Sequence, residues 1–260
     1  MARFSEAVKS VRTLRRLGVR RSSILLFPIR RRLLDGTRLK FEDGTTLTAP
    51  KEERLVTLLN DIWGDECYDK DVQSGSGDTV MDIGAHVGVF SVRAARKWPA
   101  SRIVAIEPSE GSFSYLSRNV SENRLTNVTA IRAACAGSSG TSLLHAKAGH
   151  AQATSLYDTG QGGGRSQQVT ETVSLGELFT RQQVDRCSLL KMDCEGAEYE
   201  ILFHAGAETL ERVKRIAMEY HVGPRNQGVG DLVDVLTRNN FSIDRVQPFR
   251  DGRGFLTARR

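Results

Sequence analysis

The chain has 260 residues, of which 39% are apolar and 26% charged, so it can bury the core of one large α/β domain and is not globally disordered. Four cysteines are too few for a disulfide framework, and because none forms a C-x-x-C pair the sequence offers no zinc knuckle. The longest apolar run, at 24–29, is far shorter than the ~20 residues that span a bilayer, and no signal-peptide cleavage site follows it. We therefore expect a soluble, cytoplasmic protein.

The net charge of +6 is concentrated at the N-terminus. Residues 1–40 contain twelve Lys or Arg but only Glu6 and Asp35, a balance of +10, so the rest of the chain carries −4. Such a basic arm could meet RNA, an anionic membrane surface or an acidic partner protein, or it could be a solvated surface. The sequence leaves these partners open, and it does not decide whether the chain forms a homo-oligomer.

Residues 1–71 are expected to form this basic arm followed by a cap. Apolar spacing predicts helices over 5–17 and 51–63, and Asp43-Gly44 predicts the turn of a hairpin over 38–48. The stretch 62–68 is apolar and aromatic, and such side chains are costly to leave exposed. We therefore expect it to cover a cofactor, with Tyr68 as a contact.

From residue 72 to 260, strands and helices alternate. Short apolar segments predict strands at 80–83, 102–107, 128–134, 188–193, 215–221, 241–246 and 254–258. Amphipathic segments predict helices at 89–97, 112–123, 197–207 and 231–239, and Ser174 predicts the cap of another. This pattern is typical of a doubly wound α/β domain, with a mostly parallel seven-stranded sheet covered by helices on both faces.

Residues 136–172 interrupt this alternation. They are rich in Gly, Ser, Thr and Gln, and include the run Gly162-Gly163-Gly164. Such a composition predicts a loop, mobile over about 145–170, that borders the acceptor pocket.

Ligands of open α/β sheets bind beyond the carboxyl ends of the strands. Gly84 and Gly88 follow the first strand, where glycines let the backbone approach a ligand closely, although they could also serve only strand–helix packing. Glu107 ends the second strand, 19 residues after Gly88, and suits a ribose diol. The spacing, with His86 between the glycines, matches neither the dinucleotide fingerprint nor a Walker loop.

A glycine loop preceded by Asp82 resembles the first motif of class I methyltransferases. The segment 82–90, then 105–108, and above all K-M-D-C-E-G-A-E at 191–198, resemble the FkbM family of methyltransferases and its K-x-D-x-E-G-x-E signature. The resemblance covers roughly 78–222. It departs at His86, where that family commonly has Asn, and at Arg132 beside the adenine-side loop.

The resemblance implies methyl transfer from S-adenosylmethionine to a hydroxyl of a small molecule, natural product, sugar or glycan. The implied cofactor contacts are Asp82 and the loop Gly84-Ala85-His86 through Gly88 at the methionine end. Glu107 is implied at the ribose, and Ala133 at the adenine.

An alcohol nucleophile needs an aligned methyl group and a nearby base. Asp193 and Glu195 follow the fourth strand, and His221 ends the fifth. We expect Asp193 to orient or deprotonate the acceptor hydroxyl, with His221 as the alternative base. Lys191 either stabilises the developing alkoxide or pairs with Glu195 or Glu198. We expect no metal, because no Asp/His triad is suitably spaced.

Two other functions stay open at this point. The basic arm and the pair Lys191 and Asp193 are compatible with an RNA 2′-O-methyltransferase, whose RNA affinity would fall steeply with salt. The chain could also be a non-catalytic binding module that kept the fold. Methyltransferases of base nitrogens and of base C5 are disfavoured, because the sequence has no D/N-P-P-Y stretch and no Pro-Cys dipeptide.

Overall fold

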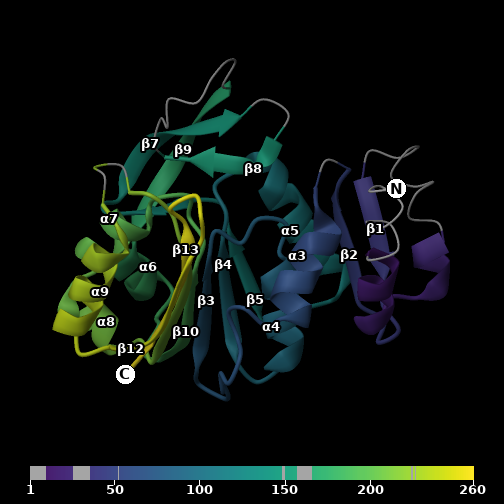
Figure 1. Cartoon of the computed structure of the whole chain (residues 1–260), viewed down its shortest axis with the longest axis horizontal. Coiled ribbons are helices and arrows are strands. Elements are labelled where there is room, and N and C mark those ends of the chain that lie inside the picture. The colour runs from purple at the N-terminus through teal and green to yellow at the C-terminus, as the bar shows by residue number, and fades with distance from the viewer. Residues whose placement is uncertain are drawn as a thin grey trace.

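The centre of the molecule is a seven-stranded sheet between two helical layers, as the computed structural model of the chain shows (Figure 1). The structure describes residues 10–25, 36–51, 53–147, 150–156, 166–223, 225 and 227–260. The strands of this sheet are β3 (Thr79–Ile83), β4 (Arg102–Ile106), β5 (Val128–Ile131), β10 (Cys187–Met192), β11 (Arg215–Tyr220), β12 (Ser242–Pro248) and β13 (Gly254–Arg259).

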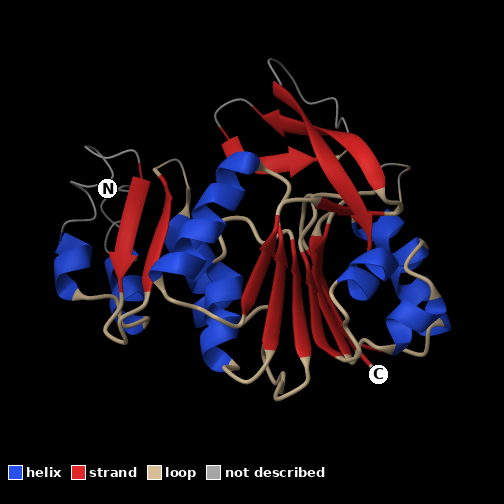
Figure 2. Ribbon diagram, turned by 180° about the vertical axis from the view of Figure 1, so that it is seen from behind, coloured by secondary structure: helices blue, strands red, loops and turns tan. Residues whose placement is uncertain are grey.

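The strand order is β12-β13-β11-β10-β3-β4-β5. The five strands from β11 to β5 are parallel, and β13 runs antiparallel to β11 and β12. The chain leaves β3 toward β4 and β5 and later returns to β10 on the other side, so strand order reverses between β3 and β10. The predicted doubly wound α/β fold with seven strands is confirmed (Figure 2).

Both faces of the sheet are covered, which explains the continuous apolar strands. One face packs on α6 (Leu175–Arg181), α7 (Glu198–Phe203), α8 (Ala207–Glu211) and α9 (Val229–Arg238), through a core that includes Met81 and Ile83. The other packs on α4 (Val89–Lys97), beside α5 (Glu110–Glu122). The helix predicted at 197–207 is in fact two helices, α7 and α8, separated by a turn at Gly206, whose φ is +74°.

The N-terminal elements join the second of these cores. The predicted hairpin is confirmed as β1 (Gly36–Lys40) and β2 (Thr46–Pro50), paired antiparallel. The helix predicted at 51–63 is shorter, α3 (Leu55–Leu59), and continues as one π-helical turn, η1 (Asn60–Gly64). Residues 10–16 are helical, whereas 5–9 lie outside the described residues. The Asn119 amide binds the backbone of both Thr48 and Val87, so α5 ties the hairpin to the loop after β3.

The prediction of a loop over about 145–170 was wrong for the residues that the structure describes there. The segment forms a second sheet from β6 (Ala134–Ala136), β7 (Gly140–Lys147), β8 (His150–Ser155) and β9 (Ser166–Ser174), in the order β6-β9-β7-β8. Thr170 and Thr172 of β9 are buried on either side of exposed Glu171, an alternation that suits a pleated strand with one buried face. The run 162–164 lies outside the described residues. This insert sheet lies beyond the carboxyl ends of β3, β4 and β10 (Figure 1).

Candidate active site

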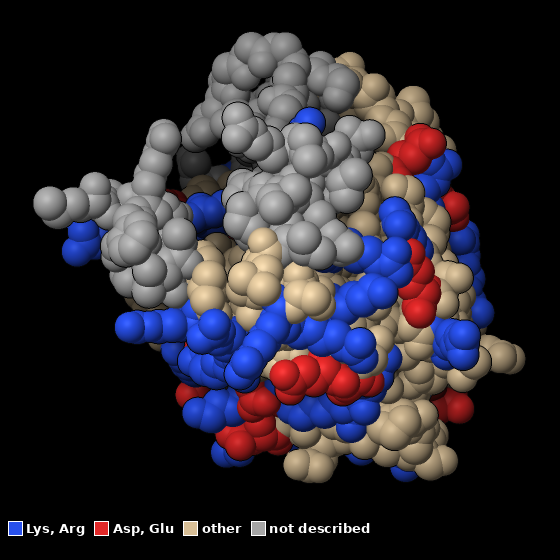
Figure 3. Space-filling model, turned by 90° about the vertical axis from the view of Figure 1, so that its right-hand side faces the viewer, with Lys and Arg blue, Asp and Glu red and all other residues tan. Residues whose placement is uncertain are grey.

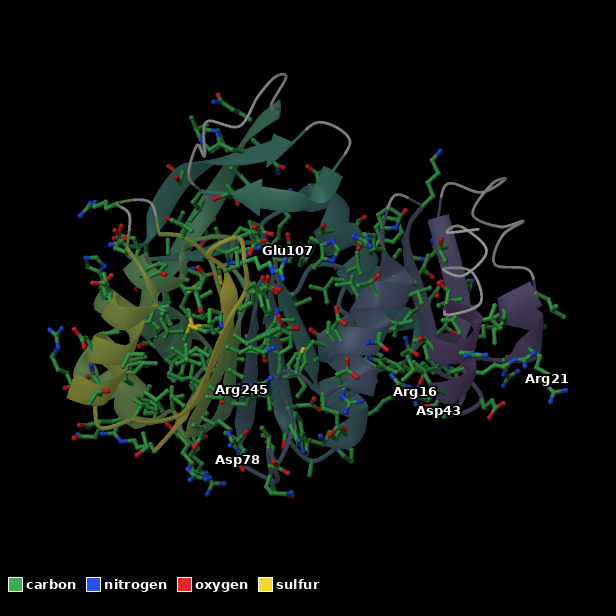
Figure 4. All side chains as sticks on the ribbon, viewed as in Figure 1. Arg16, Arg21, Asp43, Asp78, Glu107 and Arg245 are labelled. Carbon is green, nitrogen blue, oxygen red and sulfur yellow. The ribbon has the colours of Figure 1, made fainter. Side chains whose placement is uncertain are left out.

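A cavity of about 300 Å³ opens at the carboxyl edge of the parallel strands. Figure 4 places Glu107 at this edge, below the insert sheet, and Asp78 at the opposite edge. The insert sheet contributes Leu144 and Leu156 to the walls, and the N-terminal elements contribute Arg54, Thr57, Leu58 and Ile62. Within the described ranges, no group of His, Cys, Asp or Glu is arranged to hold a metal ion.

The loop after β3 must pass very close to the end of β10. Gly84 has a φ of +77°, and a Cβ on it would lie 1.9 Å from the backbone oxygen of Asp193. The backbone N–H groups of Gly84 and Ala85 both donate to the oxygen of Ile106 on β4. Gly88, with φ +83°, ends the loop against Leu116 of α5. Only glycine fits at Gly84, so this close approach explains the first glycine of the motif.

The Glu107 carboxylate is buried but lines the cavity. One oxygen accepts the backbone N–H of His86 at 2.8 Å and the other that of Ser109 at 2.9 Å. Burial raises the pKa of Glu107, although these donors and the charge of His86 oppose the rise. These hydrogen bonds therefore hold the carboxylate in one place on the wall of the cavity.

His86 links this loop to the segment before α3. Its φ is +53°, which is uncommon for a residue with a side chain, and its Nε2 lies 3.0 Å from Oε2 of buried Glu53. Burial disfavours the charged ring, but the hydrogen bond to Glu53 and the charge of Glu53 outweigh it, so the pKa of His86 is raised. His86, where the sequence departs from the FkbM pattern, thus contacts the segment before α3 through Glu53.

Asp82 does not line the cavity. Its fully buried carboxylate accepts the Ser91 hydroxyl, and Oδ1 lies 2.9 Å from Nζ of Lys191. Lys191 also donates to the backbone oxygen of Gly84 at 2.7 Å. The expectation that Lys191 pairs with Glu195 or Glu198 is therefore corrected. The reason is register, because Lys191 and Asp82 are directly paired on adjacent parallel strands.

Asp193 lines the cavity and is held from the side by Tyr68. The Tyr68 hydroxyl donates to Oδ2 of Asp193 at 3.1 Å, and its ring packs edge-on against Phe90 and Phe255. Nζ of Lys191 lies 5.3 Å from the centre of the same ring. The structure thus brings Tyr68 to Asp193, while Tyr68 itself does not line the cavity.

His221 lies behind the turn 193–196 rather than on the cavity wall. Its Nδ1 is 3.1 Å from Oε1 of fully buried Glu198, and its Nε2 is 3.4 Å from Oε2 of Glu195. Glu198 in turn accepts the backbone N–H groups of Cys194 and Gly196. Burial disfavours the imidazolium, but the hydrogen bond to Glu198 outweighs it and raises the pKa of His221 to about 10. At neutral pH His221 is therefore a cation that braces this turn.

Two further side chains on the cavity wall received no role from the sequence. Glu219 is the penultimate residue of β11, and its Oε1 lies 3.0 Å from Nη1 of Arg253 in the turn between β12 and β13. The position of Glu219 at a strand end was a usable signal. Arg253 gave none, because a hairpin arginine is ordinarily solvated. Arg132 lies on the surface, where it pairs with Glu110.

Comparison with known proteins now identifies the family. The family model described as Methyltransferase FkbM domain matches residues 82–243. The chain belongs to the FkbM methyltransferase family. Its cofactor is S-adenosylmethionine, which supplies a methyl group activated by a sulfonium. The residues present fit such a group, since the glycine loop leaves a cavity beside it and Glu107 offers a buried carboxylate.

Curated relatives cover most of the methyltransferase. Methyltransferase sdnD from Sordaria araneosa is 28% identical over 235 residues, 78% of this chain and 89% of that one. The 31-O-demethyl-FK506 methyltransferase FkbM from Streptomyces tacrolimicus is 24% identical over 236 residues, 79% and 88% of the two chains. The hexuronic acid methyltransferase AglP from Haloferax volcanii is 25% identical over 183 residues, 70% of this chain and 71% of that one.

Proposed function

We propose that this methyltransferase methylates a hydroxyl group of a small molecule, natural product, sugar or glycan. The observation that carries the proposal is Asp193, which lines the cavity while Tyr68 fixes one of its carboxylate oxygens. A carboxylate can accept the hydrogen bond of an alcohol and orient its oxygen toward a methyl donor. The names of two relatives, a demethyl-FK506 methyltransferase and a hexuronic acid methyltransferase, support an acceptor of this kind.

The cofactor contacts are proposed from the same cavity. The backbone from Gly84 through His86, with Gly88, would hold the methionine end, Glu107 the ribose hydroxyls, and the loop at Ala133 the adenine. Gly84, Ala85, His86, Glu107 and Ala133 all line the cavity, which supports these assignments. Asp82 would act indirectly, by holding Lys191 against the backbone of Gly84.

The acceptor side is assigned to Asp193 and Glu195, which line the cavity beside Glu219. The raised pKa of His221 argues against its use as the base, because an imidazolium cannot accept a proton. We therefore give His221 a bracing role on the turn that carries Asp193. Lys191 carries its charge next to Asp82, which leaves it a supporting role as well.

The N-terminal elements are proposed to close the cofactor pocket. Glu53 pairs with His86, Tyr68 binds Asp193, and Arg54 and Leu58 line the cavity. A shortened chain that begins at Gly75 should lose cofactor affinity and stability. If the shortened chain keeps full cofactor affinity and full stability, the N-terminal elements do not close the cofactor pocket.

An RNA 2′-O-methyltransferase is the second candidate. Lys and Arg gather on the face that carries the N-terminal elements, where Arg12, Arg15 and Arg21 are exposed (Figure 3). The cavity wall combines carboxylates with cations, so its charge does not by itself select a phosphate backbone; it carries Glu107, Asp193, Glu195 and Glu219 together with Arg54, Lys191 and Arg253. RNA binding that is absent at low salt would remove this candidate.

The test of the first proposal is methyl transfer from labelled S-adenosylmethionine to a panel of natural-product and sugar alcohols, read by mass spectrometry. Asp193→Asn should lower turnover by about 10²–10⁴-fold while calorimetry shows nearly unchanged affinity for S-adenosylhomocysteine. Asp185→Asn, at an exposed position before β10, is the matched control and should change neither. Methylation confined to nitrogen or carbon atoms would contradict the proposal.

A further inference from the structure

Glu219 and Asp193 stand side by side at the carboxyl edge of neighbouring strands. Met192 of β10 pairs in parallel with Met218 of β11. The residues that follow them, Asp193 and Glu219, therefore occupy adjacent positions. Both line the same cavity. On its other side Glu219 pairs with Phe255 of β13, whose ring contacts the tyrosine that binds Asp193. The two carboxylates therefore face one space.

Their hydrogen bonding differs. One oxygen of Asp193 accepts the hydroxyl of Tyr68, which holds that carboxylate in a fixed orientation. Oε1 of Glu219 is held by Arg253 at 3.0 Å, and among the described residues its Oε2 has no hydrogen-bond donor. Glu219 thus has a free oxygen beside a fixed carboxylate.

The titratable and charged groups around Glu219 come from four directions. Asp193 and Glu195 approach from the turn after β10, Tyr68 from the cap, and Arg253 from the β12–β13 turn. His221, directly after the strand that carries Glu219, places Nε2 3.9 Å from Oε1 of Glu219. Burial and the negative charge of Asp193 raise the pKa of Glu219 to about 7, although His221 and Arg253 oppose the rise. Glu219 therefore binds a proton more tightly than an ordinary glutamate does.

We propose that Glu219 is the general base of the reaction and that Asp193 orients the acceptor hydroxyl for it. This inference rests on the proposed O-methylation. In the step, the acceptor oxygen forms a bond to the methyl carbon, and the carbon–sulfur bond breaks with its electron pair remaining on sulfur. The hydroxyl proton passes to Oε2 of Glu219 and then to solvent. A base is most effective when its proton affinity matches the working pH, which favours Glu219 for this role.

The first test needs no acceptor. Carboxyl ¹³C NMR of the complex with S-adenosylhomocysteine should show Glu219 titrating near neutral pH. Asp193→Asn should lower its midpoint, because a repelling charge is lost, and Arg253→Gln should raise it, because an attracting charge is lost. Titration of Glu219 like an ordinary glutamate, at about pH 4.3, would overturn the inference whatever the acceptor is.

The second test is the pH dependence of kcat/KM for the hydroxyl acceptor found by the panel. The wild-type kcat/KM should fall tenfold per pH unit below the pH at which Glu219 is half protonated. Asp193→Asn should show the same fall, shifted to a lower pH. Glu219→Gln should lower kcat/KM by about 10²–10⁴-fold, and its kcat/KM should no longer fall toward low pH. Exposed Glu208→Gln is the control and should match the wild type.

The outcomes separate the two proposals. If Glu219→Gln methylates the hydroxyl with the same pH dependence of kcat/KM as the wild type, the role of Glu219 is overturned and the proposed O-methylation stands. A wild-type enzyme that binds cofactor but methylates no hydroxyl overturns O-methylation, and the role of Glu219 falls with it. Unchanged affinity of Glu219→Gln for S-adenosylhomocysteine excludes misfolding as the cause of a lost rate, and Glu219→Asp should restore part of the rate.

Discussion

The buried pair Lys191 and Asp82 allows a prediction of stability with a magnitude. Nζ of Lys191 lies 2.9 Å from Oδ1 of Asp82, and the two side chains are 4% and 0% exposed. Lys191→Met keeps most of the length of the side chain but removes its charge, which leaves Asp82 with Ser91 as its remaining side-chain partner. Breaking a buried ion pair on one side costs about 3–5 kcal/mol, a large share of the ~5–15 kcal/mol that keeps a domain folded.

The assay is urea unfolding at pH 7, followed by circular dichroism. Lys214→Met is the matched control, because Lys214 pairs with Asp78 at 3.5 Å while its side chain is 57% exposed. Pairs of that kind contribute about 0–1 kcal/mol. The double variant Lys191→Met with Asp82→Asn should be more stable than the sum of the single losses predicts, since it leaves no buried charge.

The reasoning fails if Lys191→Met costs no more free energy of unfolding than Lys214→Met. It also fails if the two single losses at Lys191 and Asp82 add without an interaction. Either result would mean that the ion pair does not stabilise the end of β10. Stabilisation of the developing alkoxide would then be the remaining role for Lys191.

Three other variants test the cofactor edge and the bracing ion pairs. Glu107→Ala should weaken S-adenosylhomocysteine binding at least tenfold by calorimetry, because charge-assisted hydrogen bonds are worth about 1.5–3 kcal/mol each; unchanged affinity would contradict the ribose assignment. Gly84→Ala should unfold at lower urea and lose cofactor binding, since its Cβ would lie 1.9 Å from the Asp193 oxygen, whereas Gly111→Ala, which has room, should do neither. The pKa of His221, about 10 when folded, lies above the ordinary value of 6.5, so its stabilisation is complete below pH 6.5 and is lost as pH rises through 10. Wild-type stability should therefore fall by a few kcal/mol between pH 7 and 10 relative to His221→Gln, and parallel curves would refute the ion pair.

Local patterns were enough to predict the main sheet. Strands buried on both faces are short continuous apolar runs, and the helices between them show one apolar stripe, so the seven strands could be found from periodicity. Gly84 was also readable, because a residue that must adopt positive φ against a neighbouring backbone has to be glycine. The signature at 191–198 then indicated the family, which the match over 82–243 confirmed.

Other features depend on strand order and register, which local periodicity does not encode. Lys191 meets Asp82 because β10 lies beside β3, although Glu195 and Glu198 are far nearer in sequence. The strands of the insert were mistaken for a loop, since Thr, Gln and Ser become strand residues only when a partner strand buries one of their faces. Glu219 acquires its neutral-range pKa in the same way, from burial and from Asp193 on the adjacent strand. Proton affinity and pairing at this site therefore arise where distant segments of the chain are brought together, because both are properties of the space between strands.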